Sequence, residues 1–242
     1  MDKYGLIGSP LGHSFSKIYF TVKFQKEGLS STYELFPLSA ITEFPELIEG
    51  NPELRGLNVT IPYKESVMTY LTDLSPEAKA IAAVNVIKID GYRLTGYNTD
   101  YIGFRDSLKP MLRDEITEAL VLGSGGASKA VCHALRVLGI NPTVVSRHPS
   151  EGMIGYKDIT SEVMAKNLLI VNTTPLGMAP NVDTATDIPY HLLSGRHICY
   201  DVVYNPSETL FMKKGAAAGA NVKNGLEMLH LQAENAWKIW NE

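Results

Sequence analysis

Short apolar runs alternate with amphipathic segments along most of the chain. Apolar runs at residues 3–8, 56–61, 119–122, 168–172 and 198–203 are typical of buried strands. Shorter strands are expected at 32–35, 85–89, 92–94 and 143–146, and helices at 14–27, 41–49, 128–138 and about 227–240. Repeated alternation of strand and helix indicates sheets covered by helices, so the predicted fold class is α/β. The pattern divides into two α/β units with a boundary near residue 100.

Local signals predict several element ends. Gly28 should close the first helix, and Ser75-Pro76-Glu77 has the order of N-cap, proline and acid that opens another. Asp90-Gly91 predicts a hairpin turn between two strands. Ser207 is expected to cap the helix that runs toward residue 218.

Composition narrows the classes of protein that remain. The 242 residues carry 22 Lys and Arg against 26 Asp and Glu, and this net charge of −4 argues against nucleic acid as a partner. No apolar run approaches the roughly 20 residues of a membrane helix, so no membrane partner is expected. The N-terminus lacks the apolar stretch of a secretion signal, and two distant cysteines are typical of a reducing compartment. A cytoplasmic location is therefore expected.

A glycine-rich segment, Gly123-Ser124-Gly125-Gly126-Ala127, joins the strand at 119–122 to the following helix. Such glycines allow a tight turn and bring backbone N–H groups close to a pyrophosphate at the positive end of the helix. Ser128 replaces the usual third glycine. Taken alone, such a turn is therefore explained equally well by cofactor binding and by close packing of the strand against the helix.

The residues about 20 positions further on favour NADP over NAD as cofactor. NAD enzymes normally place an acid there for the ribose hydroxyls, whereas this chain has Ser146-Arg147-His148. The Arg147 guanidinium can bind a 2′-phosphate, and Ser146 can add a hydrogen bond. The plain alternative is that Arg147 is a solvated charge after a strand.

Polar clusters stand where predicted strands give way to loops or helices, which is where ligands of open α/β sheets bind. Hydroxyls, amides, one ammonium and one carboxylate in these clusters suit a small polyhydroxylated acid. The clusters are Ser14 and Ser16, Asn58, Thr60 and Lys64, Asn85, and Asn98-Thr99-Asp100.

Each cluster also has a plain structural explanation. Ser14 could simply cap a helix, and Asp100 could complement a helix dipole. Lys64 could be a solvated charge. His13 and His230 have no further ligands at metal spacing, so no metal site is predicted.

Taken in order, these motifs resemble those of the shikimate dehydrogenase family, over nearly the whole chain. The resemblance also rests on Asn172-Thr-Thr174-Pro-x-Gly177-Met178, Asp201-x-x-Tyr204-Asn205-Pro206 and Gly225-Leu-x-Met228-Leu-x-x-Gln232. It implies a substrate-binding domain at 1–100, joined by the C-terminal helix at about 226–242. It also implies a Rossmann-like, doubly wound NADP-binding domain at 101–225, with the substrate in the cleft between the two.

The resemblance further implies reversible reduction of 3-dehydroshikimate to shikimate by NADPH, in the biosynthesis of chorismate and the aromatic amino acids. Lys64 would donate the proton in reduction and accept it in oxidation, and Asp100 would orient it. The implied substrate-binding residues are Ser14, Ser16, Asn58, Thr60, Asn85, Tyr204 and Gln232. The implied cofactor-binding residues are Gly123, Ser124, Gly125, Gly126, Ala127, Ser146, Arg147, Val202, Gly225 and Met228. Family members are monomers or homodimers.

The chain departs from the family pattern beside the expected carboxylate site. The family usually has a proline after the second serine and a His-Asn pair soon after, where this chain has Lys17 and Tyr19-Phe20. The stretch between Arg147 and Leu168 is short, so a trimmed NADP domain is expected.

Three other functions stay open from the sequence. They are a quinate/shikimate dehydrogenase of broader specificity, a catalytically silent sensor of a pathway metabolite, and another two-domain NADP dehydrogenase such as a methylenetetrahydrofolate enzyme. The Ser14-x-Ser16 and Asn98-Thr-Asp100 motifs disfavour the last of these.

Overall fold

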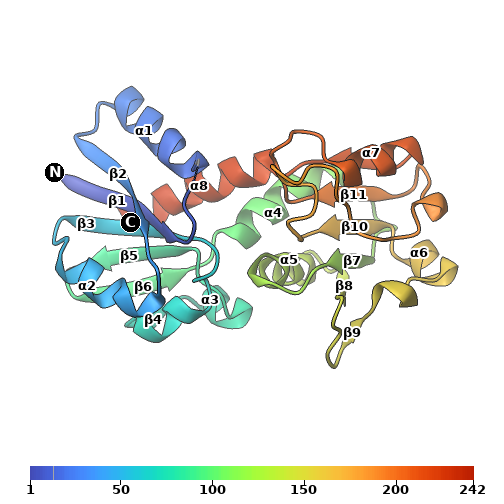
Figure 1. The fold of residues 1–242 in the computed structure, drawn as a ribbon, viewed down its shortest axis with the longest axis horizontal. Coiled ribbons are helices and arrows are strands. Elements are labelled where there is room, and N and C mark those ends of the chain that lie inside the picture. Colours follow the sequence, from blue (N-terminus) through green and yellow to red (C-terminus); the bar gives the residue numbers. More distant parts are fainter. Residues whose placement is uncertain (13) are drawn as a thin grey trace. The chain divides into compact units, whose positions relative to one another are not determined.

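The computed structural model describes residues 1–12 and 14–242, which form two compact units (Figure 1). The first unit comprises Met1–Thr99 and Ala233–Glu242, and the second comprises Asp100–Gln232. In the described residues, each unit is built on one 6-stranded sheet. Both sheets carry helices, so the predicted α/β fold class is confirmed.

The sheet of the first unit is mixed, with strand order β2-β1-β3-β5-β6-β4. Strand β1 runs parallel to β2 and β3, whereas β5 is antiparallel to β3 and to β6. Its strands are β1 (Asp2–Gly8), β2 (Ser31–Pro37), β3 (Leu54–Val59), β4 (Asp73–Leu74), β5 (Val86–Asp90) and β6 (Arg93–Tyr97). Its helical elements are α1 (Phe15–Glu27), η1 (Ile41–Glu43), α2 (Phe44–Glu49), η2 (Ser66–Tyr70) and α3 (Pro76–Ile81).

Local chemistry accounts for the ends of these elements. Gly28 ends α1 in the left-handed conformation at φ 66°, as predicted. The Ser75 hydroxyl accepts a hydrogen bond from the Ala78 N–H at 3.1 Å and caps α3, also as predicted. The hairpin between β5 and β6 is confirmed, but its two-residue turn begins at Gly91 (φ 58°), because Asp90 pairs with Arg93.

The second unit has an all-parallel sheet with strand order β12-β11-β10-β7-β8-β9. This is the doubly wound order, which reverses between β7 and β10 and places ligands at the carboxyl ends of those strands. Its strands are β7 (Glu118–Leu122), β8 (Asn141–Val145), β9 (Met153–Ile154), β10 (Leu169–Asn172), β11 (Ile198–Asp201) and β12 (Asn221–Lys223). Its helices are α4 (Asp100–Leu108), η3 (Lys109–Met111), α5 (Gly126–Val137), η4 (Tyr156–Asp158), α6 (Ser161–Lys166), η5 (Tyr190–Leu192) and α7 (Leu210–Ala217), and α8 (Leu226–Asn241) begins here.

Two features of the second unit bear on the sequence predictions. Only residues 146–152 connect β8 to β9, without a helix, which fits the trimmed domain expected from the short stretch after Arg147. The predicted cap at Ser207 is wrong. Thr209 is the N-cap of α7, because its hydroxyl accepts from the Met212 N–H at 3.3 Å.

Each unit has its own apolar core. In the first unit, Trp240 of α8 packs with Tyr4 and Phe20 and donates its indole N–H to the Ile87 carbonyl at 3.0 Å. In the second unit, Cys132 and Cys199 are buried free thiols, which confirms their interpretation as small hydrophobic residues. None of the helices in the described part of the chain combines the length and hydrophobicity needed to cross a bilayer.

Candidate active site

The start of α1 carries the two serines that the sequence predicts as carboxylate ligands. The Ser14 hydroxyl accepts a hydrogen bond from the Lys17 N–H at 3.3 Å, so its role as a helix cap is real. A hydroxyl that accepts such a bond keeps its own hydrogen for another acceptor. Ser16 is half-buried and hydrogen-bonds the Tyr33 phenol. Burial outweighs that bond and raises the pKa of Tyr33.

A buried hydrogen-bond network connects β2, β3 and the residue directly before β5 in the first unit. The Tyr33 hydroxyl donates to Asn58 Oδ1 at 2.7 Å, and Asn58 Nδ2 donates to the Asn85 carbonyl at 3.4 Å. Asn85 in turn accepts from the Thr99 N–H at 2.6 Å and donates to the Thr99 hydroxyl at 3.0 Å. Asn58 and Asn85 are 5% and 3% exposed, so these bonds fix their orientation before any ligand arrives.

Thr60 and Lys64 follow the carboxyl end of β3. Both are half-buried, and the Thr60 hydroxyl makes no hydrogen bond to a described residue. The Lys64 carbonyl accepts from the Val84 N–H at 2.7 Å, directly beside Asn85. Asn85 accepts from Thr99, the residue before Asp100. Lys64 is therefore bonded to Val84, and the residue before Asp100 is bonded to the next position, Asn85. Asp100 is the first residue of α4 and of the second unit.

Two of the departures from the family pattern, Tyr19 and Phe20, have structural roles in the first unit. The Lys17 side chain is exposed, and the Tyr19 hydroxyl donates to Glu234 of α8. Phe20 is fully buried and stacks on the Tyr33 ring, with centroids 4.9 Å apart and planes at 12°. Phe20 therefore supports the ring whose hydroxyl contacts Ser16 and Asn58.

In the second unit, the glycine-rich turn follows β7 as the sequence predicts. Gly123 has φ 108°, and a Cβ there would lie 2.9 Å from Thr173 Oγ1, so this position requires glycine. Gly125 is the N-cap of α5, and a Cβ at this position would have no described atom within 4 Å. Ser124 and Gly125 are exposed, and Gly126 and Ala127 open α5. The start of α5 is therefore accessible to an anion.

Ser146 and Arg147 follow β8, beside that turn. The Ser146 hydroxyl accepts from the His148 N–H at 3.2 Å and lies 3.5 Å from the Ser124 hydroxyl. Arg147 is exposed and forms no ion pair with a carboxylate of the described residues. An open helix start and an uncompensated guanidinium fit the pyrophosphate and 2′-phosphate of NADP.

The carboxyl end of β11 holds the residues expected beside the nicotinamide. A Cβ at Gly225 would overlap the Val202 carbonyl oxygen, and the Gly225 N–H donates to the Val203 carbonyl at 3.1 Å. Met228 is 8% exposed and belongs to the core cluster against which Val202 packs. The structure therefore brings Val202, Gly225 and Met228 together.

Tyr204 and Gln232 are the predicted substrate residues of the second unit. Burial raises the pKa of the half-buried Tyr204. Gln232 is 7% exposed and donates to the Leu229 carbonyl at 2.9 Å. A Cβ at Gly103 would lie 2.5 Å from the Met228 carbonyl oxygen and 3.1 Å from the Gln232 backbone nitrogen, so α4 and α8 pack closely at a point three residues after Asp100.

Sequence reasoning missed the side chains that hold the site residues. Tyr33 is an ordinary aromatic residue in a strand pattern, and nothing in the sequence indicates its bond to Asn58. From the sequence, Asp201 and Asn172 stand out only as parts of family motifs. Their polar character inside buried strand ends was the available signal, because a buried polar group needs a partner.

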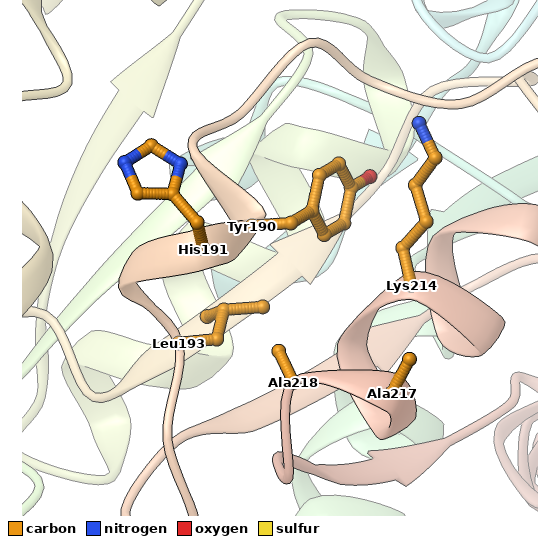
Figure 2. A pocket seen from close by; sticks show the side chains of 6 residues that line it. All are labelled: Tyr190, His191, Leu193, Lys214, Ala217 and Ala218. Atoms are coloured by element: carbon orange, nitrogen blue, oxygen red, sulfur yellow. The ribbon is translucent and has the colours of Figure 1, made fainter.

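Two further features of the described residues are separate from these sites. No group of three or more His, Cys, Asp or Glu side chains there is placed to hold a metal ion, and His13 lies outside the described residues. A shallow depression of about 530 Å³ lies between η5 and α7 and contains none of the predicted site residues (Figure 2). Its lining includes Tyr190, whose ring centroid lies 5.0 Å from Lys214 Nζ.

Comparison with known proteins agrees with this arrangement. Residues 6–87 match the family model of the shikimate dehydrogenase substrate binding domain. The NADP(+) shikimate dehydrogenase of Clostridium beijerinckii is 39% identical, over 100% of this chain and 93% of that protein. The crystal structure of a chorismate mutase/shikimate 5-dehydrogenase fusion protein from Clostridium acetobutylicum is 36% identical, with a TM-score of 0.87, covering 99% of this chain and 91% of that one.

A further solved structure is that of the shikimate 5-dehydrogenase from Thermus thermophilus in complex with NADP(H) and shikimate. It is 32% identical, with a TM-score of 0.88, and the match covers 99% of this chain and 93% of that one. These matches extend over both units and confirm the resemblance seen in the motifs. The chain belongs to the shikimate dehydrogenase family.

Proposed function

We propose that this protein is an NADP-dependent dehydrogenase that reversibly reduces 3-dehydroshikimate to shikimate. The observation that supports this most is the full-length match to NADP(+) shikimate dehydrogenases, at 39% identity for the C. beijerinckii relative. The described geometry is consistent with it, because one unit presents oriented amides and hydroxyls and the other presents an anion site with an uncompensated arginine.

The first unit binds the polyol acid in this proposal. Ser14 and Ser16 hold the carboxylate, while Asn58, Thr60 and Asn85 bond the ring hydroxyls. The buried network has already fixed the two asparagines, so little side-chain entropy is lost on binding. From the second unit, Asp100 and Gln232 complete the contacts to the ring hydroxyls, and Tyr204 lies near the carboxylate.

The second unit binds NADP through its turn and the start of α5. The residues from Gly123 to Ala127 hold the pyrophosphate, and Ser146 and Arg147 hold the 2′-phosphate. Val202, Gly225 and Met228 border the nicotinamide. When bound, NADPH supplies the hydride to the carbonyl carbon of the substrate.

Lys64 supplies the proton that the carbonyl oxygen gains, and takes it back in the oxidation. Asp100 orients the Lys64 ammonium and the substrate hydroxyl. Two hydrogen bonds support the pairing of Lys64 with Asp100. The Lys64 carbonyl accepts from the Val84 N–H, and Asn85 accepts from the N–H of the residue directly before Asp100. General acid–base groups of this kind contribute about 10²–10⁴-fold to turnover.

We place the reaction in the cytoplasm, as the two buried free thiols suggest, with the protein as a monomer or homodimer. The direct assay follows NADPH absorbance with shikimate or quinate, each combined with NADP⁺ or NAD⁺. Rapid turnover only with shikimate and NADP⁺ supports the proposal. Comparable rates with quinate or NAD⁺ replace it with a broad-specificity dehydrogenase. Shikimate binding in calorimetry without any turnover replaces it with a metabolite sensor.

A further inference from the structure

A fully buried carboxylate stands at the end of β11, next to the residues expected beside the nicotinamide. Asp201 is 0% exposed. Its Oδ1 accepts from Asn172 Nδ2 at 2.9 Å and from the Val203 N–H at 3.0 Å, and its Oδ2 accepts from the Thr209 hydroxyl at 2.6 Å. One side chain therefore ties together the end of β10, the segment after β11 and the cap of α7.

The network continues from Asn172 toward the glycine turn. Asn172 Oδ1 accepts from the Thr174 N–H at 3.1 Å and from its hydroxyl at 2.7 Å. The adjacent Thr173 hydroxyl donates to the Leu122 carbonyl at 2.7 Å and faces Gly123. Asn172 also accepts, through its carbonyl, from the Val202 N–H at 3.0 Å. The end of β10, the residue before the glycine turn and the segment after β11 thus depend on one buried network.

We propose that Asp201 is a positioning residue for the nicotinamide half of the cofactor, acting through its hydrogen bonds to Asn172, Val203 and Thr209. Its ionised carboxylate fixes residues 172–174 and 202–204 against the turn. The inference rests on the proposed use of NADP. It assigns no direct contact between Asp201 and cofactor or substrate.

The number of donors around Asp201 explains why the ionised form is needed. Three donors point at its two oxygens, and a carboxylate can accept all of them. A protonated carboxyl must donate from Oδ2, because Oδ1 already accepts two N–H groups. The Thr209 hydroxyl, which also caps α7, then loses its acceptor inside the protein. Asp201→Asn reproduces this state, since its amide nitrogen takes the place of Oδ2.

The surroundings of Asp201 make this change accessible near neutral pH. Burial raises the pKa of Asp201 to about 6, against the opposing effect of its three hydrogen bonds. The titratable groups that face it are Tyr190 of η5 and Cys199 and Tyr200 of β11. Burial raises the pKa of all three, to about 12 for Tyr190 and Cys199, so they stay neutral. No charged side chain of the described part of β10, β12 or α7 contributes to its pKa.

The test compares two ligands that differ in whether they carry nicotinamide. Calorimetry of the full-length protein at about pH 7.5 measures the Kd of NADP⁺ and of adenosine 2′,5′-bisphosphate. We expect Asp201→Asn to raise the Kd of NADP⁺ about tenfold and to leave that of the bisphosphate within about twofold. Thr209→Val removes the donor to Oδ2 together with the cap of α7. It should weaken the two ligands in the same unequal way, and it carries the test if Asp201→Asn does not fold.

A pH profile separates this role from a merely structural one. The ratio of wild-type to Asp201→Asn kcat should fall toward one as the pH drops from about 8 to about 5, because the wild-type carboxyl then becomes protonated. Asp158→Asn, which alters an exposed carboxylate bonded to the Gly155 N–H, should give a ratio near one throughout.

Each alternative result has a separate meaning. Equal weakening of both ligands by Asp201→Asn, or a ratio of kcat values that does not change with pH, would overturn the inference. Failure of the wild-type protein to bind either ligand would instead refute the proposed use of NADP, and the role of Asp201 would fall with it.

Discussion

The expected binding groups of the two units differ in kind: buried, hydrogen-bonded side chains in the first unit and exposed backbone groups in the second. In the first unit, the expected substrate ligands Asn58 and Asn85 are buried and already bonded to Tyr33 and Thr99. In the second unit, the expected pyrophosphate ligands are backbone groups of an exposed turn, and a Cβ at Gly125 would have no described atom within 4 Å.

The difference fits the ligand that each unit is proposed to recognise. Separate hydroxyl groups on a small ring demand donors and acceptors at set positions, which only oriented side chains supply. A pyrophosphate is bound by successive backbone N–H groups at the start of a helix. These groups must be reachable by the ligand, and they need no particular side chain. The first unit therefore depends on buried hydrogen-bond networks. The second depends on the absence of side chains at its glycine turn, and on the Asp201 network that holds the neighbouring strand ends.

The largest expected effect is on chemistry in the first unit. Lys64→Ala should lower kcat by about 10²–10⁴-fold, with a much smaller change in shikimate affinity, because the proton donor is lost and the binding network is not. Steady-state kinetics and calorimetry measure the two quantities. Lys79→Ala removes an exposed lysine of the same unit and should leave both unchanged. Unchanged kcat in Lys64→Ala contradicts its assigned role.

The next effect tests how far the second unit depends on missing side chains. In Gly225→Ala, the added methyl overlaps the Val202 carbonyl oxygen, so the backbone must shift. We expect a loss of about 1–3 kcal/mol in the free energy of unfolding, together with weaker NADP⁺ binding. Gly195→Ala is the matched control, since its Cβ would have only an ordinary contact at 3.7 Å. Urea unfolding of both variants decides the point, and equal stabilities would contradict it.

Asp201 should make the stability of the second unit depend on pH. Its pKa is about 6 in the folded protein against 3.8 as the ordinary value, so between these values the folded state binds more protons than the unfolded state. The contribution of Asp201 to the free energy of unfolding is therefore greatest below about pH 4, and it is lost as the pH rises through about 6. Relative to Asp201→Asn, the wild-type free energy of unfolding should fall by about 3 kcal/mol over this range. A constant difference in urea unfolding would disprove this.

The smallest expected effect concerns the buried network of the first unit. Tyr33→Phe removes the donor to Asn58 Oδ1 and keeps the stacked ring. We expect a loss of about 1 kcal/mol in stability and a several-fold rise in KM for shikimate, with NADP⁺ affinity unchanged. Tyr92→Phe, at a fully exposed tyrosine, is the control. A shift in NADP⁺ affinity instead would show that the network does not serve the substrate side.

The sequence predicted the backbone features of the fold better than the side-chain networks. Alternation of strands and helices, the cap at Ser75 and the turn after β7 depend on neighbouring residues, so they are visible in the chain. Ser207 and Thr209 are both good cap residues, so the sequence alone does not separate them. In the structure Thr209 is the cap, and its hydroxyl also donates to Asp201. The two-residue strands β4 and β9 carry too few residues for any periodic pattern.

The candidate site could be predicted only in part, because many of its contacts join residues that are far apart in the chain. Motif residues such as Asn58 and Asn85 could be named, but their partners Tyr33 and Thr99 lie 25 and 14 residues away and carry no local signal. Tyr19 and Phe20 stood out as departures from the family pattern. Only the structure shows their use, with Tyr19 bonded to Glu234 of α8 and Phe20 stacked on Tyr33.

The division of labour between the two units can be tested most directly by measuring shikimate and NADP⁺ binding in two single variants. Thr60→Val removes a hydroxyl that has no partner among the described residues, and Arg147→Gln removes an exposed guanidinium. Calorimetry should show Thr60→Val weakening shikimate by about tenfold and leaving NADP⁺ unchanged. Arg147→Gln should weaken NADP⁺ by at least about tenfold and leave shikimate unchanged. If either variant weakens both ligands equally, the two sites are not separate in the way proposed here.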